Sequence, residues 1–107
     1  DYVYITDVAR AFLAAGISES VVGGPFNVAS GQGVTISEAF SLVAKRVENI
    51  TGRKVRIENT PWPKGTDAIE HRNFVADIGA IRLASGWRPL ISFEQGVDQT
   101  IRNLLST

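Results

Sequence analysis

Two helix starts are marked in this sequence by the same combination of residue types. Thr35 stands three residues before Glu38, and Ser92 stands three residues before Gln95. In this spacing the hydroxyl accepts a hydrogen bond from the third backbone amide of a helix, and the longer side chain accepts one from the first residue's amide. Apolar residues at helical spacing follow both pairs: Ala39, Leu42, Val43, Val47 and Ile50, then Phe93, Val97, Ile101, Leu104 and Leu105. The sequence therefore predicts two amphipathic helices whose apolar residues face inward, the first being the longest of the chain.

Two shorter helices are predicted from single capping residues and glycines. Asp7, which follows a threonine, can cap a helix that ends at Gly16, and Asp77 can cap a helix through Leu83 that Gly86 closes. The first of these continues with apolar residues at helical spacing, namely Val8, Ala9, Phe12 and Leu13. The chain is therefore expected to contain about four helices.

Four short runs between these helices have the composition of strands. They are residues 2–5, 26–29, 55–58 and 74–76, which are rich in aromatic and β-branched side chains or alternate apolar with charged residues. A chain of 107 residues suits one domain with a modest core. The predicted fold class is α/β, a small mixed domain of about four helices with short strands that spans residues 1–107.

Composition excludes several classes of function. Lys plus Arg equals Asp plus Glu at 11 each, so no net field attracts nucleic acid or an anionic membrane. The chain has no cysteine, and a lone His71 cannot build a multi-histidine metal centre. No apolar stretch approaches the roughly 20 residues that span a bilayer, and no leader precedes Asp1. A cytoplasmic protein fits these features, and the absence of methionine suggests a piece of a longer protein.

Four sequence segments of the chain resemble, in the same order, segments of a known enzyme family. They are residues 1–11; residues 24–28 followed by 34–36; Ala76-Asp77 ahead of residues 86–89; and residues 92–96 with Thr100-Ile101. These segments are similar in sequence to the C-terminal region of the extended short-chain dehydrogenases/reductases, the NAD-dependent sugar-nucleotide epimerases and dehydratases. The resemblance implies a substrate-binding lobe that lacks its N-terminal Rossmann domain. It also implies a parent that is an NAD(P)-dependent epimerase, dehydratase or reductase of a nucleotide-linked sugar.

The cofactor fingerprint of a dinucleotide fold is missing from these 107 residues. Gly31 and Gly33 follow an apolar run and precede a helix, but a third glycine and the later acidic residue are absent. We therefore interpret this segment as a tight turn, and we expect NAD(P) to be bound by the parent and not by this chain.

The family's catalytic pair, a tyrosine with a lysine four residues later, is also missing. Tyr2 and Tyr4 are followed at that spacing by Thr6 and Val8. We expect the two tyrosines to pack against neighbours, and we assign no catalytic residue to the chain. Trp87 is predicted to lie in the core, and the Asn27 amide is predicted to bridge backbone groups of a neighbouring loop.

Substrate contacts are predicted in the long loop over residues 59–73, which carries no regular pattern. Arg72 lies where many members of the family carry an arginine that touches the nucleotide diphosphate, and a guanidinium suits this because it donates two parallel hydrogen bonds. The alternative is a surface arginine paired with Glu70 or Asp77.

Three more residues of the loop are candidate substrate contacts. His71 could donate a hydrogen bond to phosphate or sugar, or simply be solvated. Lys64 and Asp67 fall where relatives often show an Arg-Pro-Gly-Asp phrase, from which this sequence departs. Trp62 could stack on a nucleobase or plug the loop as a hydrophobic residue.

Two other classes of function remain open on the sequence. Some members of the wider family keep the fold and serve as regulatory or interaction modules without turnover, and an independent small α/β domain could echo the family. The expected partners are a nucleotide-sugar substrate and the missing Rossmann domain. An apolar face left exposed by the missing domain would favour self-association.

Overall fold

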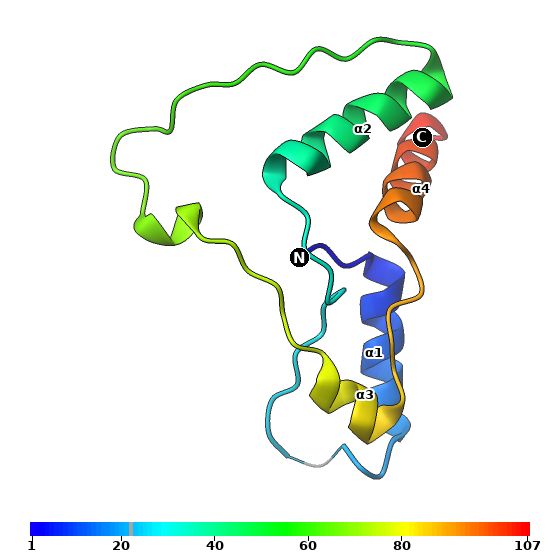
Figure 1. Ribbon diagram of the computed structural model, residues 1–107. Helices are drawn as coiled ribbons and strands as arrows, with labels where there is room; N and C mark the ends of the chain where they lie inside the picture. The colour runs from blue at the N-terminus through cyan, green and yellow to red at the C-terminus, as the bar shows by residue number, and fades with distance from the viewer. Residues whose placement is uncertain (22) are drawn as a thin grey trace. The chain divides into compact units, whose positions relative to one another are not determined.

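The computed structural model describes residues 1–21 and 23–107, and the side chains of Glu70 and His71 lie outside the described part. Its helices are α1 (Ile5–Ile17), α2 (Ile36–Thr51), α3 (Gly79–Ser85) and α4 (Phe93–Leu105), with a short 3-10 helix, η1 (Ala68–His71) (Figure 1). The chain divides into two compact units. Unit 1 contains residues 1–33 and 75–107 and holds α1, α3 and α4, whereas unit 2 contains residues 34–74 and holds α2 and η1.

Both predicted capping boxes are present. The Thr35 hydroxyl accepts a hydrogen bond from the Glu38 amide at 3.1 Å, and the Glu38 carboxylate accepts one from the Thr35 amide at 2.9 Å. At α4 the corresponding distances between Ser92 and Gln95 are 3.2 and 2.9 Å. Gly52 ends α2 in the left-handed conformation, with φ of 73°.

The starts of α1 and α3 differ from those predicted. Helix α1 begins at Ile5, so Asp7 lies inside its first turn and is not its cap. Helix α3 begins at Gly79 after an Ile78 N-cap that makes no side-chain hydrogen bond, although the Asp77 carboxylate accepts a hydrogen bond from the Gly79 amide at 2.8 Å. The predicted end of α1 at Gly16 lies one residue before the observed end.

The predicted α/β class is wrong, because the described residues contain helices and no strand or sheet. An isolated strand has no internal backbone hydrogen bonds and depends on a neighbour for them. Residues 55–58 illustrate this: they carry the alternating pattern, yet Val55 and Ile57 are each 47% exposed, and Arg56 pairs with Glu58 at 2.7 Å. The pattern predicted a strand's composition but not a pairing partner.

Side-chain hydrogen bonds take the place of a backbone ladder in unit 1. The Asp1 carboxylate accepts hydrogen bonds from the amides of Ser30, Gly31 and Ala76 at 2.8, 2.9 and 3.3 Å, and from the Ser30 hydroxyl at 2.6 Å. Backbone amides within or directly after the apolar runs 26–29 and 74–76 are therefore bound by the Asp1 carboxylate and not by a neighbouring strand.

The core of unit 1 is small and lies between α1 and α3, which lie side by side (Figure 1). Its buried members are Ala11, Ile81 and Trp87, with exposed fractions of 1 to 3%. Partly buried hydrophobic residues surround them, namely Ala14, Phe26, Val28 and Ile78. The prediction that Trp87 is a core residue is confirmed.

Asp7 is the buried charge of this core, with 1% of its surface exposed. Its carboxylate accepts hydrogen bonds from the amides of Leu90 and Ile91 at 2.9 to 3.1 Å, and from the Arg10 guanidinium at 3.0 Å. The Trp87 indole donates to the Asp7 carbonyl at 3.0 Å. One residue of α1 thus fixes the chain between α3 and α4.

Helix α4 buries less of its apolar face than predicted. Phe93 and Gly96 contact the N-terminal segment, and Val97 and Ile101 are partly buried. Leu104 and Leu105 were expected to face inward, but they are 69% and 60% exposed. The reason is that the N-terminal segment, residues 2–4, contacts only the first turn of the helix, at Phe93 and Gly96.

We predict that Asp7→Asn lowers the free energy of unfolding by about 2–4 kcal/mol, because a neutral amide directs N–H groups at backbone donors that the carboxylate accepts. Urea denaturation of the 107-residue chain measures this. The matched control is Glu19→Gln at an exposed position, which should change stability by at most about 0.5 kcal/mol. A similarly small change for Asp7→Asn would show that the carboxylate does not hold unit 1 together.

Candidate functional site

The predicted substrate residues lie in the second half of unit 2, where the chain leaves α2 and runs without a helix until η1. Pro63 and Thr66 close a turn there: the Thr66 hydroxyl donates to the Pro63 carbonyl at 2.6 Å, and Gly65 adopts φ of 81°. Lys64 lies in this turn and is exposed. Trp62 precedes the turn and is 53% exposed.

Helix η1 positions Arg72. The Asp67 carboxylate accepts a hydrogen bond from the Ile69 amide at 3.2 Å and starts the helix, and the Arg72 amide donates to the Ile69 carbonyl at 3.3 Å as it ends. The Arg72 guanidinium then lies over the Phe74 ring, with its central carbon 5.1 Å from the ring centroid. This cation–π contact holds the charge over the ring face, and a guanidinium carries several N–H groups that can donate to an anion.

The other predicted contacts are only partly described. The backbone of His71 closes η1, but its side chain is outside the described residues, as is that of Glu70, one proposed partner of Arg72. The other proposed partner, Asp77, accepts the Gly79 amide hydrogen bond that precedes α3. Ligand roles for Arg72, His71, Lys64 and Trp62 stay predictions.

The charged residues of this segment are balanced, so it presents no broad basic surface to an anion. Residues 59–74 contain two basic residues, Lys64 and Arg72, and two acidic residues, Asp67 and Glu70. A phosphate group would therefore be recognised by individual side chains, with a bidentate guanidinium contributing the strongest hydrogen bonds.

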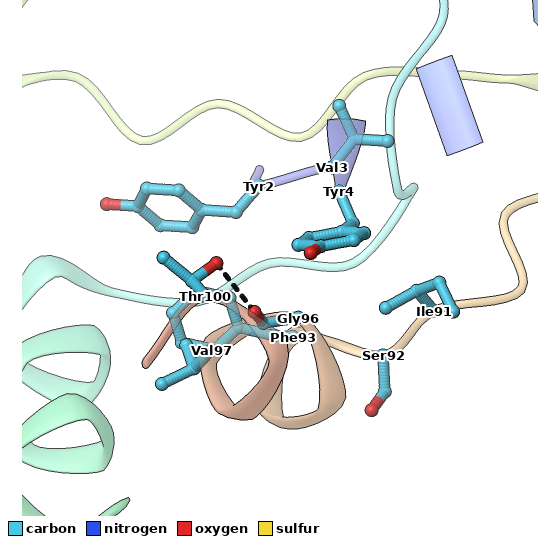
Figure 2. Close-up of a pocket in the computed structure, with 9 residues that line it drawn as sticks. All are labelled: Tyr2, Val3, Tyr4, Ile91, Ser92, Phe93, Gly96, Val97 and Thr100. Atoms are coloured by element: carbon cyan, nitrogen blue, oxygen red, sulfur yellow. Dashed lines mark hydrogen bonds between the residues drawn. The ribbon is translucent and has the colours of Figure 1, made fainter. Parts of the chain in front are cut away.

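A second concave feature lies in unit 1, between the N-terminal segment and α4 (Figure 2). It is an open pocket of about 230 Å³ with a mainly apolar lining, formed by Tyr2, Val3, Tyr4, Ile91, Ser92, Phe93, Gly96, Val97 and Thr100. The Tyr2 and Phe93 rings have centroids 5.2 Å apart and are tilted by 33°. The Thr100 hydroxyl donates to the Gly96 carbonyl at 2.8 Å, as Figure 2 shows.

The pocket depends on a glycine in the first turn of α4. A Cβ atom at Gly96 would lie 2.9 Å from Cδ2 of Tyr4 and 3.4 Å from its Cγ, so the ring rests directly on the helix backbone. The tyrosines were predicted to pack, and both do, although not within a strand. Sequence reasoning missed the pocket, and the signal that could have revealed it was Gly96 inside a capped helix.

The lining of this pocket carries no carboxylate, imidazole or cationic side chain. Its polar groups are hydroxyls, and it is smaller than the 300–1,000 Å³ typical of small-molecule sites. Such a recess can hold a ring or an apolar side chain.

The Asn27 prediction is confirmed: its side-chain amide donates to the Asp77 carbonyl at 3.4 Å. Within the described residues, no group of three or more His, Asp or Glu side chains lies together in a way that could hold a metal ion. The helices of the described chain are all too short or too polar to cross a bilayer.

Comparison with known proteins gives one distant likeness. No family model matches the chain, and no solved structure matches it. The dTDP-4-dehydro-6-deoxyglucose reductase of Escherichia coli is 24% identical over 104 residues, which are 97% of this chain and 30% of the E. coli protein. The chain thus spans about 30% of the length of that curated relative. The likeness indicates a distant relationship to a sugar-nucleotide reductase.

We predict opposite stability changes for two helix glycines. Gly96→Ala should lower the free energy of unfolding by about 1–3 kcal/mol, because its methyl group meets the stiff Tyr4 ring. Gly16→Ala is the matched control in α1: its Cβ meets nothing within 4 Å, so it should raise stability by up to about 1 kcal/mol. Thermal denaturation of both variants measures the difference, and equal changes would contradict the contact at Gly96.

Proposed function

We propose that this chain is the nucleotide-sugar-binding portion of an NAD(P)-dependent epimerase, dehydratase or reductase. The observation that carries the proposal is the likeness to the dTDP-4-dehydro-6-deoxyglucose reductase, which extends over 97% of the chain. Family phrases from residue 1 to residue 101 agree with it. We also propose that the parent works in the cytoplasm on a sugar linked to a nucleoside diphosphate.

In this proposal Arg72 binds the diphosphate. Its guanidinium is held over Phe74 beside the end of η1, and its planar fork can donate two parallel hydrogen bonds to phosphate oxygens. Phe74 is 57% exposed, so the stacked pair lies at the surface where a ligand can reach it. The ring limits the positions of the guanidinium and so reduces the entropy lost on binding.

The neighbouring residues have supporting roles in the proposal. Lys64 supplies a second positive charge from the turn at Gly65, and Trp62 offers a half-exposed ring on which a nucleobase can stack. His71, next to Arg72, is a further candidate donor to phosphate or sugar.

The turn at Gly31 and Gly33 does not fit a dinucleotide. A pyrophosphate needs free backbone amides at such a turn, but the amides of Ser30 and Gly31 already donate to the Asp1 carboxylate at 2.8 and 2.9 Å. A negative carboxylate at this position also repels a phosphate. We therefore assign NAD(P) binding, and with it the hydride transfer that this cofactor supplies, to the rest of the parent protein.

Arg72→Ala tests the ligand assignment. In the full-length parent, calorimetry with dTDP-glucose should show affinity about 10 to 100 times weaker, the loss expected for a charge-assisted bidentate contact. The affinity for NADH should stay within about twofold. Arg53→Ala, at another exposed arginine of unit 2, should change neither affinity. Equal losses for both ligands, or no loss, would remove Arg72 from the substrate site.

The cofactor assignment has its own test on the 107-residue chain. Calorimetry with NAD should show no binding in the micromolar range, because the amides of the Gly31 turn are occupied. Micromolar binding of NAD would contradict the assignment of cofactor binding to the rest of the parent protein. Asp1→Ala is the informative variant, since it frees these amides.

A further inference from the structure

Unit 2 is joined to unit 1 by two segments of unit 1 that lie against each other. Residues 27–33 lead out of unit 1 and residues 75–78 lead back into it, and we call them the leaving segment and the returning segment. A Cβ atom at Gly33, the last residue before unit 2, would lie 3.0 Å from Cγ2 of Val75, the first residue after it. The chain therefore leaves and re-enters unit 1 at neighbouring points.

The Asp1 carboxylate binds both segments. In the leaving segment its Oδ1 atom accepts hydrogen bonds from the Ser30 amide at 2.8 Å and from the Ser30 hydroxyl at 2.6 Å. Its Oδ2 atom is shared, because it accepts one from the Gly31 amide at 2.9 Å and one from the Ala76 amide, in the returning segment, at 3.3 Å. Hydrogen bonds to an ionised acceptor are roughly twice as strong as those between neutral groups. One charged side chain thus holds the two segments together.

The other described contacts between the two segments are weaker. The Asn27 side-chain amide donates to the Asp77 carbonyl at 3.4 Å, which is long for a hydrogen bond. A Cβ atom at Gly31 would lie 3.4 Å from Cδ1 of Ile78, so the contact there is with an aliphatic side chain and is not directional. The position of the returning segment therefore depends mainly on the Asp1 carboxylate.

The returning segment continues the part of the chain that carries the candidate phosphate ligand. Arg72, whose guanidinium lies over the Phe74 ring, precedes Ala76 by four residues. The Arg72 backbone is extended, with φ of −81° and ψ of 151°, and no helix lies between it and Ala76. Four residues of chain reach at most about 14 Å, so a fixed Ala76 amide restricts where Arg72 can lie.

We propose that Asp1 is a positioning residue for the proposed substrate site. By holding the Ala76 amide, its carboxylate fixes one end of the segment that carries Arg72 and Phe74, and so limits the positions of the guanidinium before a diphosphate binds. Ordering a segment in advance reduces the conformational entropy lost on binding, and affinity rises without a new contact. The inference rests on the proposed function, because Asp1 acts on the ligand only through Arg72.

Limited trypsin digestion of the 107-residue chain tests the positioning without a ligand. Trypsin cleaves a segment only when it opens locally, and cleavage of the Arg72–Asn73 bond therefore reports the freedom of this segment. Asp1→Asn replaces one acceptor oxygen by an NH2 group that faces amide donors. We expect it to raise the initial cleavage rate at Arg72 by about fivefold or more. Cleavage after Arg10 should rise by less than about twofold, because that bond lies inside α1 and reports the unfolding of unit 1 as a whole.

Glu19→Gln is the matched control, since it removes one carboxylate charge at an exposed position of unit 1 and should change neither cleavage rate. An equal rise at Arg72 and Arg10 in Asp1→Asn would mean that Asp1 only stabilises unit 1, and no rise at Arg72 would mean that it does not hold the segment. Either result would overturn the proposal. If Asp1→Asn does not fold, Asp1→Glu replaces it: the charge stays, but the carboxylate moves by one methylene, and cleavage at Arg72 should still rise more than cleavage at Arg10.

A double-mutant cycle in the full-length parent tests the link to the ligand. Calorimetry with dTDP-glucose should show affinity about three to ten times weaker for Asp1→Asn, with the affinity for NADH unchanged. When Arg72 is already alanine, adding Asp1→Asn should cause no further loss, because a residue that acts through Arg72 has nothing left to position.

The cycle separates the two ideas. A loss for Arg72→Ala with none for Asp1→Asn, or losses that add in the double variant, would overturn the positioning role and leave the proposed function intact. No loss for Arg72→Ala would overturn the ligand assignment itself, and the positioning role with it.

Discussion

The buried carboxylate of Asp7 is the interaction on which unit 1 depends. The carboxylate accepts hydrogen bonds from the Leu90 and Ile91 amides, just before α4, and from the Arg10 guanidinium on its own helix. The Asp7 backbone carbonyl accepts one from the Trp87 indole. A buried charge is stabilising only when its hydrogen bonds are complete, and here the carboxylate is bound by donors from two parts of the chain, Arg10 and the Leu90 and Ile91 amides. Because the core between α1 and α3 is small, this polar centre carries much of the specificity that a larger apolar core would supply.

Local signals were read correctly from the sequence, whereas signals that need a distant partner were not. The capping boxes at Thr35 and Ser92 lie within four residues of sequence, and both are present. A strand forms only when its backbone pairs with that of another strand, and the sequence did not specify such a partner. In the structure the amides of Ser30, Gly31 and Ala76 donate to the Asp1 carboxylate instead. Asp7 was assigned to a helix cap because its true partners, Leu90 and Ile91, lie more than eighty residues away.

The same distinction applies to the candidate sites. Arg72 could be nominated because residue type and position in a long loop are visible in the sequence, but its contact with the Phe74 ring depends on how the loop folds. The pocket beside Tyr4 could not be predicted, since it depends on the approach of a ring to Gly96 at the far end of the chain. The two features have different chemistry: one presents a cation at the surface, and the other is a mainly apolar recess lined in part by two tyrosines.

The hydrogen bonds of Asp1 have a consequence for the order of folding. They join the first residue to Ser30, Gly31 and Ala76, so residues 34–74 are an insertion in sequence between the two segments of unit 1. Contacts of such long sequence separation require loop closure before they stabilise anything, which slows folding. Helix α2 can form from local signals as soon as it is synthesised. Unit 1 cannot close until Ile91 has left the ribosome, so α1 has no supporting core while residues 18–91 are being synthesised.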